Sequence, residues 1–120
     1  MIKKIKYHYM TIPTFELFKS DVNNQYYFRL KAENGKLILA SEGYTAKHSC
    51  KEGIESVKRN APYDERYERK INSGSFTFVL KAPNGEIIGR SQSYSTASNR
   101  ETGLEAVKKD APNAPVEEVN

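Results

Sequence analysis

Residues 28–38 read Phe28-Arg29-Leu30-Lys31-Ala32-Glu33-Asn34-Gly35-Lys36-Leu37-Ile38, and residues 78–88 read Phe78-Val79-Leu80-Lys81-Ala82-Pro83-Asn84-Gly85-Glu86-Ile87-Ile88. Each stretch contains an alternating apolar run, an Asn-Gly pair and a second apolar run. This pattern is typical of two β-strands joined by a tight turn, and Asn-Gly favours a two-residue type I′ turn. The sequence therefore predicts two β-hairpins of the same design.

The similarity extends well beyond the hairpins. When the chain is compared with itself at an offset of 50 residues, 28–62 align with 78–112 without a gap, and 15 of these 35 positions are identical. Such self-similarity at a fixed spacing indicates a duplicated structural unit. We assign the two repeats to residues 15–62 and 67–112.

Each repeat is expected to form three strands followed by one helix. The expected strands are residues 15–19, 25–33 and 36–44 in the first repeat, 67–71, 75–82 and 86–94 in the second, and a last short strand at 116–119. At 120 residues the chain has the length of one domain, and each half alone would bury too little surface to be stable. We therefore predict an α+β fold in which two tandem β-β-β-α repeats, within a single domain at 15–120, share one antiparallel sheet with two helices packed on one face. Residues 1–14 lie outside the repeats and are expected to form a flexible N-terminal tail, or alternatively an added edge strand.

The helices have recognisable boundaries in the sequence. Ser49 and Glu52 have the spacing of a capping box, and Asn99 occupies the same place in the second repeat. Pro62 and Pro112 are expected to end the helices. The apolar stripe that would cover the sheet consists of Ile54, Val57, Ala61, Leu104, Val107 and Ala111.

Both helices contain a glycine, Gly53 and Gly103, directly before an apolar anchor residue. A glycine inside a helix costs about 1 kcal/mol relative to alanine. Its presence in both repeats predicts that each helix approaches the sheet, or the other helix, very closely.

A two-residue turn sets the register of the first hairpin. It would pair Ala32 with Leu37 and Leu30 with Leu39, so that these residues face the helices and the alternate residues face away from them. The candidate binding surface on this second, open face comprises Tyr27, Arg29, Lys31, Ile38, Tyr44, Val79, Lys81, Ile88, Arg90 and Tyr94.

The composition, 38% hydrophobic and 28% charged, is that of a soluble globular protein. Of the formal net charge of +4, three positive charges come from Lys3, Lys4 and Lys6, so residues 10–120 carry only +1 (16 basic minus 15 acidic). The single cysteine, Cys50, excludes an intramolecular disulfide, and no secretory or membrane-spanning run of apolar residues is visible, so a cytoplasmic location is expected.

The sequence offers little catalytic chemistry. His48 and Cys50 are the only nucleophile-and-base candidates, and Ser98 and Arg100 replace them in the second repeat, which favours a structural role. One cysteine and two histidines are too few for a Cys/His zinc site. We therefore predict no catalytic, cofactor-binding or metal-binding residues and expect that the protein is not an enzyme.

The order of motifs resembles that of the YegP-like family, small bacterial and archaeal proteins of unknown function. The motifs are Phe-x-Leu-Lys-Ala-x-Asn-Gly-x-Ile-Ile, then Ser-x-x-Tyr, then Gly-Ile/Leu-Glu-x-Val-Lys before Ala-Pro. They occur in both repeats, with Leu37 in place of the first Ile in the first repeat. The resemblance implies tandem β-β-β-α units in one continuous sheet, with helices on one side and exchanged terminal strands. It implies no activity and no catalytic residues.

These observations favour a small binding or assembly module that uses its open sheet face for protein contacts or self-association, as a monomer or homodimer. The alternative is a nucleic-acid-binding protein that uses the same basic and aromatic face together with the Lys-rich N-terminal tail. No membrane partner is expected.

Overall fold

The computed structural model describes residues 12–119 of the 120-residue chain. Its sheet has seven strands in the order β4-β5-β6-β3-β2-β1-β7. The strands are β1 (Thr14–Lys19), β2 (Tyr26–Lys31), β3 (Leu37–Ala40), β4 (Tyr67–Asn72), β5 (Ser75–Lys81), β6 (Ile87–Arg90) and β7 (Val116–Glu118). The helices are α2 (Lys47–Asn60) and α3 (Ala97–Asp110), and the 3-10 turns η1 (Asp64–Arg66) and η2 (Ala111–Asn113) follow them.

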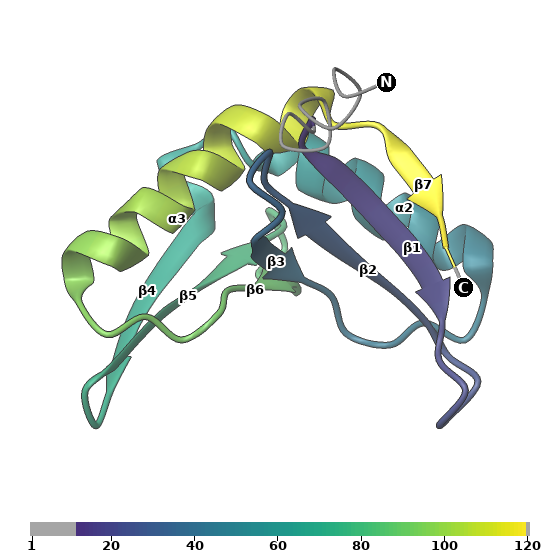
Figure 1. Ribbon diagram of the computed structural model, residues 1–120, viewed down its shortest axis with the longest axis horizontal. Coiled ribbons are helices and arrows are strands. Elements are labelled where there is room, and N and C mark those ends of the chain that lie inside the picture. Colours follow the sequence, from purple (N-terminus) through teal and green to yellow (C-terminus); the bar gives the residue numbers. More distant parts are fainter. Residues whose placement is uncertain (1–11, 120) are drawn as a thin grey trace, which may run out of the picture.

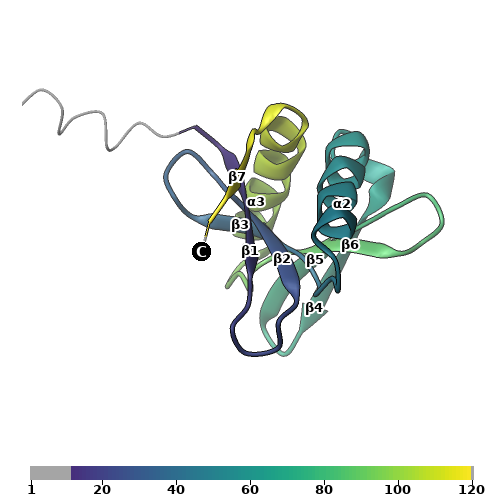
Figure 2. The ribbon, with the colours of Figure 1, turned by 90° about the vertical axis from the view of Figure 1, so that its right-hand side faces the viewer.

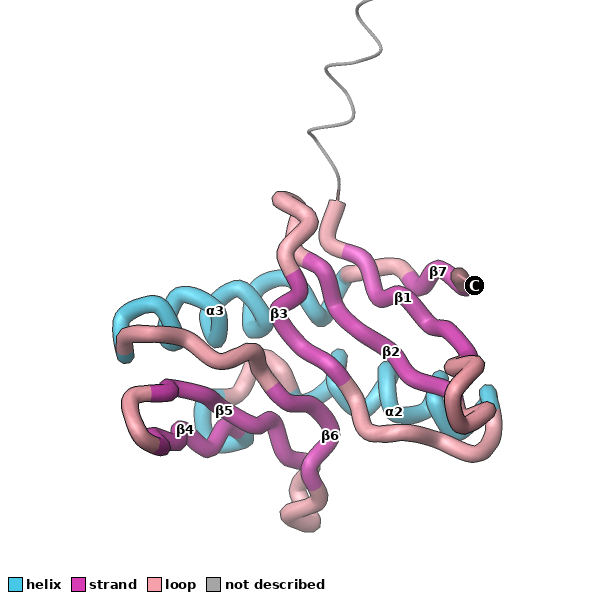
Figure 3. Tube along the Cα trace, turned by 60° about the horizontal axis from the view of Figure 1, so that its bottom comes forward, coloured by secondary structure: helices cyan, strands magenta, loops and turns pink. Residues whose placement is uncertain are grey.

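Both helices lie on the same side of the sheet (Figures 1 and 2), which confirms the predicted α+β fold of tandem β-β-β-α repeats. Neighbouring strands are antiparallel except β7, which runs parallel to β1. Viewed from below in Figure 3, the strands lie in front of the helices and form the open face. Of the predicted N-terminal tail, only residues 12–14 are described, and Lys3, Lys4 and Lys6 lie outside the described residues.

The two repeats share one hydrophobic core. Helix α2 contacts β1 and β2 of its own repeat as well as β5 and β6 of the other, and α3 contacts β5 and β3. The fully buried phenylalanines Phe15, Phe28 and Phe78 belong to a single cluster with residues from both helices. Burying a phenylalanine side chain contributes about 1.5–3 kcal/mol, so this shared cluster contributes to the stability of both repeats.

Gly53 and Gly103 allow each helix to lie directly against a tyrosine. A Cβ atom at Gly53 would overlap the hydroxyl of Tyr44, and one at Gly103 would overlap the hydroxyl of Tyr94. The ring of Tyr44 also stacks on Phe28, with 6.4 Å between centroids. The predicted close approach of helix to sheet is confirmed at both glycines.

The turn predicted for the hairpins is wrong in type. In the first hairpin the N–H of Ala32 donates to the carbonyl of Lys36 (2.9 Å), and the N–H of Gly35 donates to the carbonyl of Ala32 (2.8 Å). Gly35 has φ +84°, so the loop has three residues and ends on a left-handed glycine. The second hairpin has the same loop, in which Gly85 has φ +88°.

The additional loop residue shifts the strand pairing by one position. Lys31, and not Ala32, therefore pairs with Leu37. A β-bulge between the Lys31–Leu37 pair and the following pair then restores the predicted pairing of Leu30 with Leu39. The predicted register is thus right in the body of the hairpin and wrong beside its loop.

The third strands are shorter than expected because a serine hydroxyl ends the ladder. The backbone N–H of Phe28 donates to Ser41 Oγ (2.9 Å) and the N–H of Phe78 donates to Ser91 Oγ (2.9 Å). The hydroxyl takes the place of a backbone acceptor, so the chain leaves the sheet at this point. It returns at Tyr44, which pairs with Tyr26 as an isolated bridge.

The predicted helix starts are also wrong. Helix α2 begins after Ala46, which makes no side-chain cap, and α3 begins after Thr96, whose hydroxyl accepts the N–H of Asn99 (3.0 Å). Ser49 and Asn99 lie inside the first turns. The predicted ends are right, since the helices stop at Asn60 and Asp110, shortly before the prolines.

Helices within residues 12–119 are too short and too polar to cross a membrane.

Candidate functional site: the open face of the sheet

The structure divides the predicted binding surface between the two faces of the sheet. Strand alternation and pairing place six of its residues on the open face, namely Tyr27, Arg29, Lys31, Val79, Lys81 and Arg90. The other four lie on the helix side, namely Ile38, Tyr44, Ile88 and Tyr94. The prediction that these four point away from the helices is wrong.

Two features of the backbone explain the error. Ile38 and Ile88 are the extra residues of the β-bulges, which turn them into the core, where they are only 6% and 7% exposed. Tyr44 and Tyr94 pair with Tyr26 and Phe76, residues that alternate with the open-face positions of β2 and β5. Simple alternation from the Asn-Gly turns cannot anticipate either feature.

One row of residues crosses the open face from β1 to β4. Paired in order across six neighbouring strands, it consists of Glu16, Arg29, Ala40, Arg90, Val79 and Glu68. Arginines near the middle are therefore flanked by a carboxylate at each end. Val79 is buried although it lies on this face, between the cross-strand neighbours Glu68 and Arg90.

Each of the four predicted cations on the open face contacts a carboxylate. The ion pairs are Arg29–Glu16 (2.8 Å), Lys31–Glu16 (3.4 Å), Lys81–Glu68 (2.5 Å) and Arg90–Glu42 (2.6 Å). Partial burial opposes ionisation of Glu16, but the hydrogen bond from Arg29 and the nearby charge of Lys31 outweigh it and lower the pKa of Glu16. The hydrogen bond from Lys81 likewise lowers the pKa of Glu68. The face is therefore a surface of paired charges.

An aromatic cluster distinguishes the first repeat's half of this face. The rings of Phe18 and Tyr27 are stacked, with 5.8 Å between centroids and 20° between planes. The guanidinium of Arg29 lies 4.5 Å from the centroid of Phe18, and the side-chain amide of Asn23 donates to the hydroxyl of Tyr27 (2.8 Å). These contacts hold the cluster in one arrangement on a half-exposed surface.

The second repeat has no such cluster among the described residues. At the equivalent positions Lys70 replaces Phe18, Thr77 replaces Tyr27 and Val79 replaces Arg29. Lys70 pairs directly with Thr77 in the sheet, as Phe18 does with Tyr27. The same scaffold therefore carries two chemically different half-faces.

Sequence reasoning missed Phe18 and Glu16 as members of this surface. The signal was present, because Leu17 belongs to the core and its neighbours in a strand must face the other way. Phe18 also pairs with Tyr27, which was already assigned to the open face.

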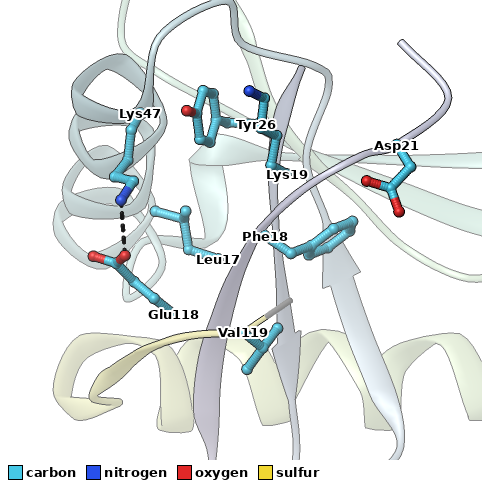
Figure 4. Close-up of a pocket in the computed structure, with 8 residues that line it drawn as sticks. All are labelled: Leu17, Phe18, Lys19, Asp21, Tyr26, Lys47, Glu118 and Val119. Carbon is cyan, nitrogen blue, oxygen red and sulfur yellow. Dashed lines mark hydrogen bonds and ion pairs between the residues drawn. The ribbon is translucent and has the colours of Figure 1, made fainter. Parts of the chain in front are cut away.

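A depression of about 640 Å³ adjoins the cluster at Phe18. It is lined by Leu17, Phe18, Lys19, Asp21, Tyr26, Lys47, Glu118 and Val119. Figure 4 shows Lys47 and Glu118 joined along one side, where the two atoms Nζ and Oε1 are 2.9 Å apart, with Phe18 and Asp21 opposite. The hydrogen bonds from Lys47 and Lys51 lower the pKa of Glu118. The depression lies beside the last residues of β1, Phe18 and Lys19, which follow the part of that strand paired with β7.

His48 and Cys50 do not form a nucleophile-and-base pair. Residues two apart on a helix point in different directions, and here His48 is exposed whereas Cys50 is fully buried. Burial raises the pKa of the Cys50 thiol to about 11, which makes it a poor nucleophile at neutral pH. Within residues 12–119, no three His, Cys, Asp or Glu side chains lie close enough together to hold a metal ion.

Comparisons with known proteins agree on the family. The profile of the domain of unknown function DUF1508 matches the chain twice, at residues 21–68 and 72–118. Each match begins near the second strand of a repeat and ends in the strand that follows the helix. Two curated relatives are the UPF0339 protein in the ptx operon 5′ region of Stutzerimonas stutzeri, 58% identical, and the UPF0339 protein YegP of Escherichia coli K12, 56% identical. Both alignments span 59 residues, 49% of this chain, so the chain spans about half the length of these relatives (52% and 53%).

Two solved structures have the same fold. The solution NMR structure of the E. coli protein of unknown function yegP has a TM-score of 0.84 at 50% identity and covers 91% of this chain and 94% of its own. The solution NMR structure of the UPF0339 protein SO3888 of Shewanella oneidensis has a TM-score of 0.83 at 40% identity and covers 88% and 90%. The predicted resemblance is thereby confirmed, and the chain belongs to the DUF1508 family, in which it is a tandem, YegP-like member whose function is unknown.

Proposed function

We propose that this chain is a non-catalytic, cytoplasmic protein-binding module, and that its partner docks on the first repeat's half of the open face. The observation that carries the proposal is the stacked pair of Phe18 and Tyr27 with the Arg29 guanidinium over Phe18. Aromatic residues and arginine are enriched at the centres of protein interfaces and account for much of their binding energy.

The surroundings of the cluster support this choice. Glu16 and Lys31 lie beside it as a paired, half-exposed border, and a polar border around an aromatic centre is the usual organisation of a protein interface. Arg29 and Glu16 are already hydrogen-bonded, at 2.8 Å, so a partner would meet a preorganised surface. Preorganised side chains lose less conformational entropy on binding.

The same ion pairs argue against nucleic acid as the main partner. A phosphate group would have to compete with Glu16 for Arg29 and with Glu42 for Arg90, whose Nε–Oε2 distance is 2.6 Å. Nucleic-acid binding depends on cations that exchange counterions for phosphate. The nucleic-acid alternative is therefore retained only as an outcome of the tests below.

A photo-crosslinking amino acid at Tyr27 would test the proposal in living cells of the source organism. The matched control carries the same amino acid at Thr77, the equivalent position of the second repeat. We expect a discrete crosslinked protein from position 27 that weakens when Phe18 and Arg29 are both changed to alanine, and little product from position 77. Equal products from the two positions, or no protein product from either, would contradict the proposal.

Filter binding against single-stranded RNA and DNA at low and high salt tests the alternative. We expect no retention at either salt concentration. Retention at low salt that is lost in F18A/R29A would indicate that this face binds nucleic acid and not a protein partner.

A further inference from the structure

The two strands at the outer ends of the repeats differ in what covers them. The outer edge of β1 is covered by β7, since the N–H of Phe15 donates to the carbonyl of Pro115 (2.9 Å) and the N–H of Val119 donates to the carbonyl of Leu17 (2.9 Å). Strand β4, by contrast, ends the sheet. Within residues 12–119, its outer edge has no strand beside it.

The hairpin turn determines which backbone groups of β4 point outward. Ser73 and Gly74 form a two-residue turn with φ values of 52° and 80°, and Asn72 pairs with Ser75 across it. Because hydrogen-bonded and non-hydrogen-bonded pairs alternate, the N–H and C=O groups of Arg69 and Ile71 point away from β5. The N–H of Tyr67 also points outward, but it donates to the carbonyl of Asp64 in η1.

The side chains along this edge alternate in charge. Glu68 and Lys70 lie on the open face, on either side of Arg69, which lies on the helix side. The charge of Arg69 is neutralised within the molecule, because its Nε is 2.9 Å from Glu101 Oε2 and its Nη2 is 2.9 Å from Asp64 Oδ1. Ile71 is 66% exposed, an unusual position for a large apolar side chain on a strand edge.

We propose that the outer edge of β4 binds β4 of a second copy of this chain, antiparallel, about a two-fold axis at Arg69. The two Arg69 residues would exchange both of their backbone hydrogen bonds, and the N–H of each Ile71 would donate to the carbonyl of the partner copy's Tyr67. The two sheets would then continue as one sheet across the axis. This surface is separate from the open-face cluster of the first repeat, so the inference does not depend on the proposed function.

Charge selects this register over its neighbours. Only residues with outward backbone groups can form hydrogen-bonded pairs across the axis. The possible registers therefore differ in which residue of β4 lies on the two-fold axis. Centring the pair on Glu68 or on Lys70 would oppose two carboxylates or two ammonium groups, which is destabilising although Lys81 is ion-paired with Glu68 in each copy, because Lys81 is the one cation that forms an ion pair with Glu68 within residues 12–119. Centring it on Arg69 instead opposes Glu68 to Lys70 twice, and centring it on Ile71 would run the strand into the Ser73 turn.

The same pairing gives the exposed isoleucine a neighbour. With Arg69 at the axis, Ile71 of one copy lies opposite Tyr67 of the other on the helix side. The like charges at the axis are tolerable because each Arg69 already holds two carboxylates. A strand edge with these features is suited to self-pairing and not to an arbitrary peptide, whose charges would have to match the Glu68 and Lys70 positions.

Sedimentation equilibrium and light scattering of the full chain, from micromolar to millimolar concentration, would test the proposal. We expect the apparent mass to rise from 13.7 kDa towards twice that value. Hydrogen exchange at the amides of Arg69 and Ile71 should slow about tenfold over the same range, whereas the amide of Lys70, which points towards β5, should not change.

Charge-reversed variants make the test specific. E68K and K70E should each remain monomeric, because each variant opposes like charges twice, and an equimolar mixture of the two should form a heterodimer. The double variant E68K/K70E should dimerise like the natural chain. K36E is the matched control for net charge, since Glu86 occupies that position in the second repeat, and it should dimerise normally.

Three results would overturn the proposal: a natural chain that stays monomeric throughout, single variants that still dimerise, or a mixture that fails to pair. All the substituted side chains are exposed, and circular dichroism of each variant would establish that it is folded.

Discussion

Phe15 and Tyr67 occupy equivalent places in the outer strands of the two repeats, and the ammonium groups of Lys58 and Lys108 lie 5.9 Å from the centroids of their respective rings. Two residues further along, the repeats diverge. Leu17 is buried beside β7, whereas Arg69, its counterpart, is exposed and held by Glu101 and Asp64.

The difference shows that one scaffold can finish its sheet in two ways. An apolar residue at this position requires a covering strand, because otherwise its side chain would face water. A charged residue with two carboxylate partners requires none, and it leaves the backbone edge accessible. The duplicated core is therefore common to both repeats, while the covering of each outer strand is specific to one.

The largest expected effect concerns what the repeats share. Phe28 and Phe78 are equivalent, and both are fully buried in the common core. We expect F28A and F78A each to reduce the free energy of unfolding by about 3–5 kcal/mol. Both should unfold in a single transition in urea, monitored by circular dichroism and fluorescence. Two separate transitions in F78A would show that the repeats fold independently.

The next effect concerns the covered edge. Ending the chain after Pro115 would remove β7, expose Leu17 and leave the backbone groups of β1 that bond to β7, among them the carbonyl of Leu17, without their partners. We expect a loss of about 2–3 kcal/mol in the free energy of unfolding, most of it from exposure of Leu17. E118Q, which weakens only the contacts with Lys47 and Lys51, serves as the control and should cost much less. Equal losses in the two variants would mean that the ion pairs, and not the strand, protect this edge.

The third prediction concerns the uncovered edge and its dependence on pH. Hydrogen bonds from Arg69 and Lys108 lower the pKa of Asp64 from 3.8 to about 2. Because the pKa in the folded state is depressed, this contribution to stability is present above the ordinary pKa and disappears as the pH falls from 3.8 towards 2.

R69L makes the second edge resemble the first, where leucine stands in this position. We expect the pKa of Asp64 to rise towards its ordinary value, as measured by NMR titration of the carboxyl carbon, and stability to vary less with pH in that window. K109E, on the exposed side of α3, is the control for a charge change and should leave this titration as it is. An unchanged pKa of Asp64 in R69L would show that the hydrogen bond from Lys108 alone keeps that pKa low.

The smallest effect concerns Cys50 and its counterpart Arg100. Both are buried, but Arg100 reaches the edge of the sheet, where its Nη1 donates to the carbonyl of Lys70 (3.3 Å), whereas the Cys50 thiol stays within the core. With a pKa raised by burial to about 11, the thiol should react with iodoacetamide at pH 8 far more slowly than free cysteine. Full labelling in urea serves as the control, and rapid labelling of the folded chain would place Cys50 at the surface.

Much of the fold could be predicted from the sequence. Alternation in β2 and β5 correctly separated Phe28 and Leu30 from Arg29. The equivalent glycines Gly53 and Gly103 correctly predicted close contact between each helix and the sheet. The placement of Ile38 could not be predicted, because the three-residue loop and the β-bulge change the register locally. That of Tyr44 could not be predicted either, because the chain leaves the ladder at Ser41 and returns opposite Tyr26, one residue out of the predicted register. The candidate site was accordingly found only in part, with Tyr27 and Arg29 recognised and Phe18 overlooked.

The duplication, the order of strands and helices and the separation of core from surface positions in β2 and β5 were determined by the sequence alone, because periodicity and turn residues act over a few neighbouring positions. Three features were decided only by tertiary structure: which face the bulged residues take, that each of the four predicted cations of the open face meets a carboxylate, and that, within residues 12–119, one outer strand has a strand beside it while the other has none. Each of these depends on pairing between strands distant in the chain, such as β1 with β7 and β3 with β6. Contacts of that kind are determined by how the whole core packs.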